Sequence, residues 1–129
     1  MNDYDKIDSY LEQNLDTSLG ELSRLVAQPS VGAQNLGIKE CAALVAAMLK
    51  ARGFDVRVMD TKGAPVVYGE REGKSDKTLL IYNHYDVQPP EPLDLWDSPP
   101  FEPSFIGRNV MLILSPGFRV DLVQPRRAR

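Results

Sequence analysis

Several residue types are scarce in this 129-residue chain, and each scarcity excludes a class of protein. One cysteine, Cys41, excludes an intramolecular disulfide, and the chain has a single histidine and a single tryptophan. No apolar run approaches the roughly 20 residues of a membrane-spanning helix. The net charge is −3, so no overall basic surplus indicates nucleic acid. The acidic start of the chain lacks a signal-peptide pattern, and we expect a cytoplasmic protein with neither nucleic acid nor membrane as a partner.

Lysine is absent from the last part of the chain, where the charge changes sign. Residues 1–104 hold 10 Lys+Arg and 17 Asp+Glu, a net charge of −7. Residues 105–129 hold five arginines and one acid, a net charge of +4. We therefore expect residues 1–104 to form one folded portion and residues 105–129 to be a divergent, arginine-rich tail.

Apolar residues recur at helical spacing in two segments. The first stripe predicts a helix from about Tyr4 to Ala27, which Pro29 ends. The second predicts a helix from about Ile38 to Arg52, with Gly53 as its left-handed cap. Cys41 lies on the apolar face of this second helix, so we expect it to be a small buried hydrophobe.

Extended segments follow the helices. Residues 54–58 alternate between apolar and charged side chains, which predicts a half-exposed edge strand. Residues 65–68 predict a second short strand, and Thr78–Tyr82 a third that is the most buried of the three. Residues 110–114 are a further candidate strand. Helices followed by strands indicate an α/β layer architecture, although three strands are few for a finished sheet of this class.

Six of the ten prolines lie in residues 89–103, together with Trp96 and Phe101. Prolines restrict the backbone, and the aromatic side chains can hold it against the domain. This pattern favours an ordered loop packed near the preceding strand. The alternative is an interdomain spacer, against which the two aromatic residues argue.

His84 and Asp86 stand where the predicted third strand ends and the proline-rich loop begins. Side chains two residues apart on an extended chain point to the same side. In an open α/β sheet, ligands bind just beyond the carboxyl ends of the strands. The pair can therefore hold one metal ion, with the acid orienting the imidazole. The alternative is that His84 is an ordinary loop or core residue, which is the commoner outcome for so short a motif.

A longer pattern around this pair is far more specific. The buried strand is followed by His-Tyr-Asp-Val-Gln-Pro at residues 84–89, then Trp96, then Pro-Phe-Glu-Pro at residues 100–103. This combination strongly resembles the di-zinc metallopeptidase family M-twenty (M20), which includes aminoacylases, acetylornithine deacetylase, succinyl-diaminopimelate desuccinylase and carnosine-type dipeptidases. The Val-Gln-Pro and Pro-Phe-Glu-Pro spellings are most similar to the dipeptidase branch. The Gln-Pro-Ser-Val loop at residues 28–31 fits as well, so the resemblance covers residues ~4–104.

The resemblance implies a fold, a cofactor and a substrate class. The fold is α/β, the N-terminal part of a zinc-peptidase catalytic domain, with two helices packed on an incomplete mixed sheet. His84 is then a ligand of one of two zinc ions, and Asp86 is a catalytic residue that fixes the imidazole tautomer. The substrate is a small peptide or an N-acyl amino acid, cleaved at its amide bond. Family members are often homodimers through a domain that has no room here.

The chain departs from the family after residue 104. The Asp-Asp-Lys-Gly box with its bridging carboxylate does not follow, and the paired glutamates and the distal histidine have no counterpart. We therefore expect a truncated or frameshifted chain that binds zinc weakly at most and is inactive alone, since a catalytic zinc needs about three protein ligands. The alternative function is that of a non-catalytic fragment or interaction module that pairs through its open sheet edge.

Overall fold

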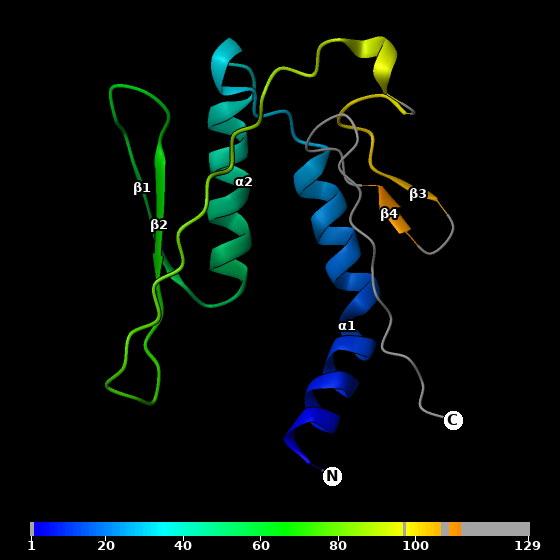
Figure 1. The fold of residues 1–129 in the computed structure, drawn as a ribbon. Helices are drawn as coiled ribbons and strands as arrows, with labels where there is room; N and C mark the ends of the chain where they lie inside the picture. Colours follow the sequence, from blue (N-terminus) through cyan, green and yellow to red (C-terminus); the bar gives the residue numbers. More distant parts are fainter. Residues whose placement is uncertain (1, 97, 107–108, 112–129) are drawn as a thin grey trace.

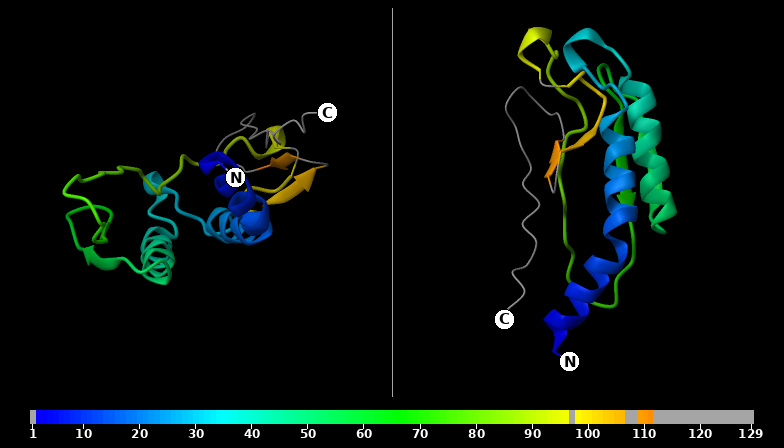
Figure 2. Two further views of the ribbon diagram at one scale, coloured as in Figure 1. Left: turned by 90° about the horizontal axis from the view of Figure 1, so that it is seen from below. Right: turned by 90° about the vertical axis from the view of Figure 1, so that its right-hand side faces the viewer.

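A computed structural model describes residues 2–96, 98–106 and 109–111 of the chain. Figure 1 shows a β-hairpin on one side of α2 and the long helix α1 on its other side. Figure 2 gives the same arrangement from below, with α1 and a second small hairpin at the end of the molecule opposite to the first. None of the described helices combines the length and the apolar character that crossing a membrane requires.

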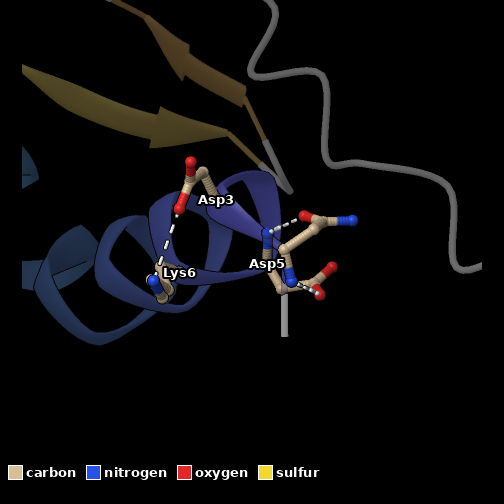
Figure 3. Close-up of polar contacts among 4 residues, drawn as sticks. Asp3, Asp5 and Lys6 are labelled. Carbon is tan, nitrogen blue, oxygen red and sulfur yellow. Dashed lines mark hydrogen bonds and ion pairs between the residues drawn. The ribbon is translucent and has the colours of Figure 1, made fainter.

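Helix α1 (Asp3–Val26) begins at a complete capping box. The Asn2 side chain accepts a hydrogen bond from the Asp5 backbone amide, and the Asp5 carboxylate accepts one from the Asn2 backbone amide (Figure 3). Each hydrogen bond is 2.9 Å long. These contacts satisfy two amides that the first turn otherwise leaves unpaired. Lys6 adds a 3.3 Å ion pair to Asp3 within the same turn. The helix predicted from about Tyr4 to Ala27 is therefore confirmed.

The apolar stripe of α1 is only partly covered. Its second half is half-buried, whereas the first half is open to solvent, with Tyr4, Ile7, Tyr10 and Leu11 at least half exposed. Contact with α2 lies near the C-terminal part of α1, where Glu21 forms an ion pair with Arg52. Among the described residues, nothing covers the first three turns of the stripe.

Helix α2 (Ile38–Ala51) provides most of the small core. Its buried residues are Ile38, Cys41, Ala42 and Ala46. Gly53 follows with a φ of +78°, as expected of a left-handed residue after a helix. The predicted second helix and the burial of Cys41, which is 1% exposed, are both confirmed.

Strands β1 (Asp55–Met59) and β2 (Val66–Glu70) form an antiparallel hairpin that packs on α2. Gly69 sits where a side chain would crowd Leu49 of the helix, with a methyl group there only 3.2 Å from Leu49 Cδ1. The opposite face of the hairpin is solvated, and on it Arg57 stacks 5.0 Å from the centre of the Tyr68 ring. The two predicted strands are thus confirmed, as are the α/β class and the incomplete sheet, but the described strands pair antiparallel rather than in the expected mixed sheet.

A second antiparallel hairpin joins β3 (Ser104–Ile106) to β4 (Asn109–Met111). The strand expected at residues 110–114 corresponds in part to β4, and its last three residues lie outside the described part of the chain. The partner strand β3 was not predicted from the sequence. The expected division into residues 1–104 and 105–129 stays a prediction, because most of the second range is not described.

The prediction of a buried third strand at Thr78–Tyr82 is wrong. These residues form no ladder with any strand of the described chain, and Leu79, Leu80, Ile81 and Tyr82 are 72–89% exposed. Figure 1 shows them within a long coil that leads from β2 to the short 3-10 helix η2 (Leu93–Leu95). A central strand is defined by neighbours that accept its backbone hydrogen bonds, and apolar composition alone does not supply those neighbours.

Candidate functional site

The segment that carries His84 and Asp86 lies against the loop before α2. The Val87 amide donates a 2.9 Å hydrogen bond to the Ser30 carbonyl, and Val31 pairs with Val87 in a parallel bridge. Val31 is completely buried and also forms two backbone hydrogen bonds with Leu36. The site segment is therefore fixed beside the short 3-10 helix η1 (Gly32–Gln34), near the beginning of α2 (Figure 1).

Tyr85 also ties the segment that carries His84 and Asp86 to the rest of the molecule. Its hydroxyl donates a 2.5 Å hydrogen bond to the carbonyl of the buried Pro65, and its own carbonyl lies 3.8 Å from Cys41 Sγ. Burial raises the pKa of the Tyr85 hydroxyl, so this group stays a donor over the physiological range. Burial also raises the pKa of the Cys41 thiol, against an opposing side-chain hydrogen bond from Ser30. Cys41 is thus a packed, protonated thiol rather than a reactive one.

His84 and Asp86 project to one side of the chain, as their spacing predicts. The imidazole Nδ1 lies 3.2 Å from Asp86 Oδ1 and 2.9 Å from the Asp86 carbonyl oxygen. Both neighbours of Nδ1 are acceptors, so the geometry requires the neutral ring to carry its proton on Nδ1. Among the described residues nothing hydrogen-bonds Nε2, so its lone pair is free there, on a side chain that is 80% exposed.

The described residues offer a metal ion one strong ligand rather than a complete site. Within the described ranges, no group of three or more His, Cys, Asp and Glu side chains could hold a metal ion. A catalytic zinc site needs about three protein ligands, and a two-metal site needs more. His84 Nε2 fits the role of one zinc ligand, and the roles assigned to His84 and Asp86 stay predictions.

Trp96 holds the proline-rich loop folded back on itself. Trp96 Nε1 donates a 2.6 Å hydrogen bond to the Pro90 carbonyl, across the turn that contains η2. Gln34 of η1 lies 3.5 Å from the Glu91 carboxylate. The described part of the loop is thus folded against itself and against η1, which agrees with the expected packed loop rather than a spacer.

Two residues of the site were not identified from the sequence as participants. Gly32 lies directly over the Asp86 carboxylate, and Ser30 accepts the hydrogen bond from Val87. The Gln-Pro-Ser-Val loop belongs to the family pattern, but no local signal in the sequence links it to His84. Only the approach of two distant segments reveals the connection.

Comparison with known proteins agrees with this picture. No family model matches the chain. The chain is 39% identical over 83 residues to the succinyl-diaminopimelate desuccinylase of Aromatoleum aromaticum, a match that covers 64% of this chain and 21% of the relative. It is 34% identical over 112 residues to the Cys-Gly metallodipeptidase of Schizosaccharomyces pombe, covering 75% of this chain and 23% of the relative.

A solved structure gives a match of the same kind. An M20 family metallo-carboxypeptidase from Sulfolobus solfataricus superposes with a TM-score of 0.68 at 38% identity, over 71% of this chain and 21% of that one. The chain matches the N-terminal part of an M20 metallopeptidase. The expected resemblance, including its restriction to the N-terminal part, is confirmed.

The M20 match is partial in length. The chain spans between a fifth and a quarter of the relatives that it matches. Their names describe hydrolases of small substrates, among them a metallodipeptidase and a desuccinylase. The words hydrolase, metallopeptidase and dipeptidase thus describe these relatives, of which this chain matches one part.

Proposed function

We propose that this chain supplies one metal ligand, His84, and its orienting acid, Asp86, to a two-zinc hydrolase of the M20 type. The observation that carries the proposal is the contact of His84 Nδ1 with two acceptors of Asp86, which leaves Nε2 free to bind a cation. A carboxylate that holds the far nitrogen of a ligating imidazole fixes its orientation and raises its basicity. The substrate class is a small peptide or an N-acyl amino acid, cleaved at its amide bond.

Zinc bound in such a site supplies Lewis-acid polarisation of the scissile carbonyl and activation of a water molecule. The contribution of this chain is to hold a neutral imidazole with its lone pair outward. The Ser30–Val87 hydrogen bond and the Tyr85 anchor restrict the backbone on either side of Asp86. The cytoplasm, where thiols stay reduced, is the proposed compartment, and it suits a free buried Cys41.

The isolated chain is proposed to be catalytically incomplete. No three-ligand cluster exists among the described residues, and the sequence holds no second histidine. Loss of a general base alone typically lowers a rate 10²–10⁴-fold. Purified chain should therefore hydrolyse dipeptides and N-acetyl amino acids at the background rate with added zinc. Turnover that a chelator and His84→Ala both abolish would refute this part of the proposal.

A chimera tests the role of His84 directly. Residues 4–104 would replace the corresponding part of the Sulfolobus M20 metallo-carboxypeptidase, whose remaining chain supplies the other ligands. We expect chelator-sensitive hydrolysis in the chimera and its loss in the same chimera with His84→Ala. A matched control is Asn83→Ala, next to His84 but not assigned to the metal. If the folded chimera keeps full activity after His84→Ala, His84 is not a ligand.

A second candidate function is favoured by one observation. Leu79–Tyr82 is apolar and 72–89% exposed, and its backbone forms no ladder in the described structure. Such a segment can pair edge to edge with another chain, as expected of a non-catalytic interaction module. Chemical crosslinking of the purified chain, with Ile81→Lys as the comparison, separates this candidate from a monomeric fragment.

A further inference from the structure

We propose that Gly32 is a positioning residue for Asp86, and through it for His84. A methyl group on Gly32 would lie 2.7 Å from Asp86 Oδ2 and 3.5 Å from its Cβ and Cγ. A carbon-to-oxygen approach of 2.7 Å is well inside van der Waals contact. The carboxylate therefore occupies its place only because position 32 has no side chain.

Position 32 requires a glycine because of the space that the Asp86 carboxylate occupies, and not because of its backbone conformation. Among the described residues, the glycines with positive φ are Gly37 and Gly53, and Gly32 is not one of them. An alanine at position 32 therefore meets no backbone strain within η1. The one close obstacle to its methyl group is the Asp86 side chain.

The two backbones cannot readily separate to relieve that conflict. Gly32 follows Val31 and Asp86 precedes Val87, and these two valines form a parallel bridge. Val31 is fully buried. The neighbouring Ser30–Val87 hydrogen bond adds a second tie. The carboxylate is the mobile group, since rotation about two bonds moves it away. An added methyl group at position 32 should therefore displace the carboxylate and leave the fold in place.

Displacement of the carboxylate reaches His84. Oδ2 faces Gly32 while Oδ1 of the same group contacts His84 Nδ1 at 3.2 Å. A rotation that frees Oδ2 from the methyl group also moves Oδ1 away from the imidazole. Among the described residues, the acceptor that then remains at Nδ1 is the Asp86 carbonyl, 2.9 Å away. The claim that Gly32 helps to position a metal ligand rests on the proposed function. The steric relation between Gly32 and Asp86 does not depend on it.

A double-mutant cycle on the metal-free full chain tests the inference. The variants are Gly32→Ala, Asp86→Ala and both together, with Gly20→Ala as control because a methyl group there meets nothing within 4 Å. The readout is the pair of ring-nitrogen NMR signals of His84, the sole histidine, measured at about pH 8.5 where an ordinary imidazole is neutral. Thermal unfolding is measured alongside.

We expect Gly32→Ala to shift the His84 ring-nitrogen signals only when the Asp86 carboxylate is present. Gly32→Ala moves the His84 ring signals from the wild-type position toward those of Asp86→Ala and changes Tm little, because the obstructing oxygen is the far end of a side chain that can rotate. In the Asp86→Ala background the same substitution changes neither, because the obstructing oxygen is gone. Gly20→Ala leaves the ring signals in place. Ring signals that stay at the wild-type position in Gly32→Ala, or in Asp86→Ala, overturn the proposal.

Two further outcomes are also decisive. If Gly32→Ala fails to fold and the double variant folds, the conflict with the carboxylate is established, which supports the inference. If both fail to fold, Gly32 is required for another reason and the inference is overturned. The chimera separates this inference from the proposed function: a shift of the ring signals in Gly32→Ala, together with full activity of the folded chimera after His84→Ala, leaves Gly32 as a positioning residue and removes His84 as a metal ligand.

Discussion

The amide of Val87 donates a 2.9 Å hydrogen bond to the carbonyl of Ser30, and this contact joins the candidate site to the core of the molecule. Val31, beside Ser30, is buried completely, so the hydrogen bond is screened from water on one side. Within the described part of the chain, the backbone of Leu79–Tyr82 has no such tie. The chain therefore passes from solvated coil at Leu79–Tyr82 to a fixed backbone at Val87.

This transition predicts a step in amide hydrogen exchange. The amides of Leu79–Tyr82, which form no ladder in the described structure, should exchange at rates near those of an unfolded peptide. The Val87 amide should exchange much more slowly, with a protection factor close to that of core amides in α2. Protection of Leu80 and Ile81 equal to that of Val87 would contradict the prediction and would indicate a partner strand.

Substitution of Gly37 should be far more damaging than substitution of an unconstrained glycine. Gly37 has a φ of +67°, and a methyl group there would lie 2.0 Å from the Pro29 carbonyl oxygen. We expect Gly37→Ala to lower the free energy of unfolding by about 2 kcal/mol or more, through strain and steric overlap. Gly20→Ala, inside α1, should instead be neutral or stabilising by up to about 1 kcal/mol. Urea denaturation of the two variants provides the comparison, and equal midpoints would contradict it.

Stability should fall at alkaline pH partly because of Cys41. Burial raises the pKa of its thiol above the ordinary value of 9.0 in the folded chain, so the folded state holds this proton more tightly than the unfolded state. The stabilisation is complete below about pH 9 and is lost as the pH rises through the raised pKa. The free energy of unfolding should thus decline more steeply with pH in the wild type than in Cys41→Ala. Parallel curves for the two proteins between about pH 9 and pH 11 would show that Cys41 does not contribute.

A charge in the exposed apolar segment should reduce self-association. Leu80 is 83% exposed, and its backbone forms no ladder with any described strand. Such a segment favours pairing between chains. Leu80→Lys should shift the chain toward monomer in light scattering at a given concentration. Leu11→Lys is the matched control, since Leu11 is also more than half exposed but lies on α1, whose backbone hydrogen bonds are internal. An equal effect of both substitutions would indicate general surface hydrophobicity rather than strand pairing.

The local features of this protein follow from its sequence. The spacing of apolar residues predicts the ends of α1 and α2 to within one residue. Gly53 marks the left-handed turn after α2. Alternation defines β1, and the two-residue interval between His84 and Asp86 places both side chains on one side. Each of these properties depends on interactions between residues close in the chain, so a short window of sequence is sufficient.

Contacts between distant segments were decided by the tertiary structure alone. The apolar run at Leu79–Tyr82 has the composition of a buried strand, yet it is exposed, because pairing depends on partners that the run itself does not encode. The support of Asp86 by Gly32, and of Val87 by Ser30, requires two segments to meet beside α2. Sequence spacing brings His84 and Asp86 together, whereas the space that Asp86 occupies is created by a glycine from another part of the chain.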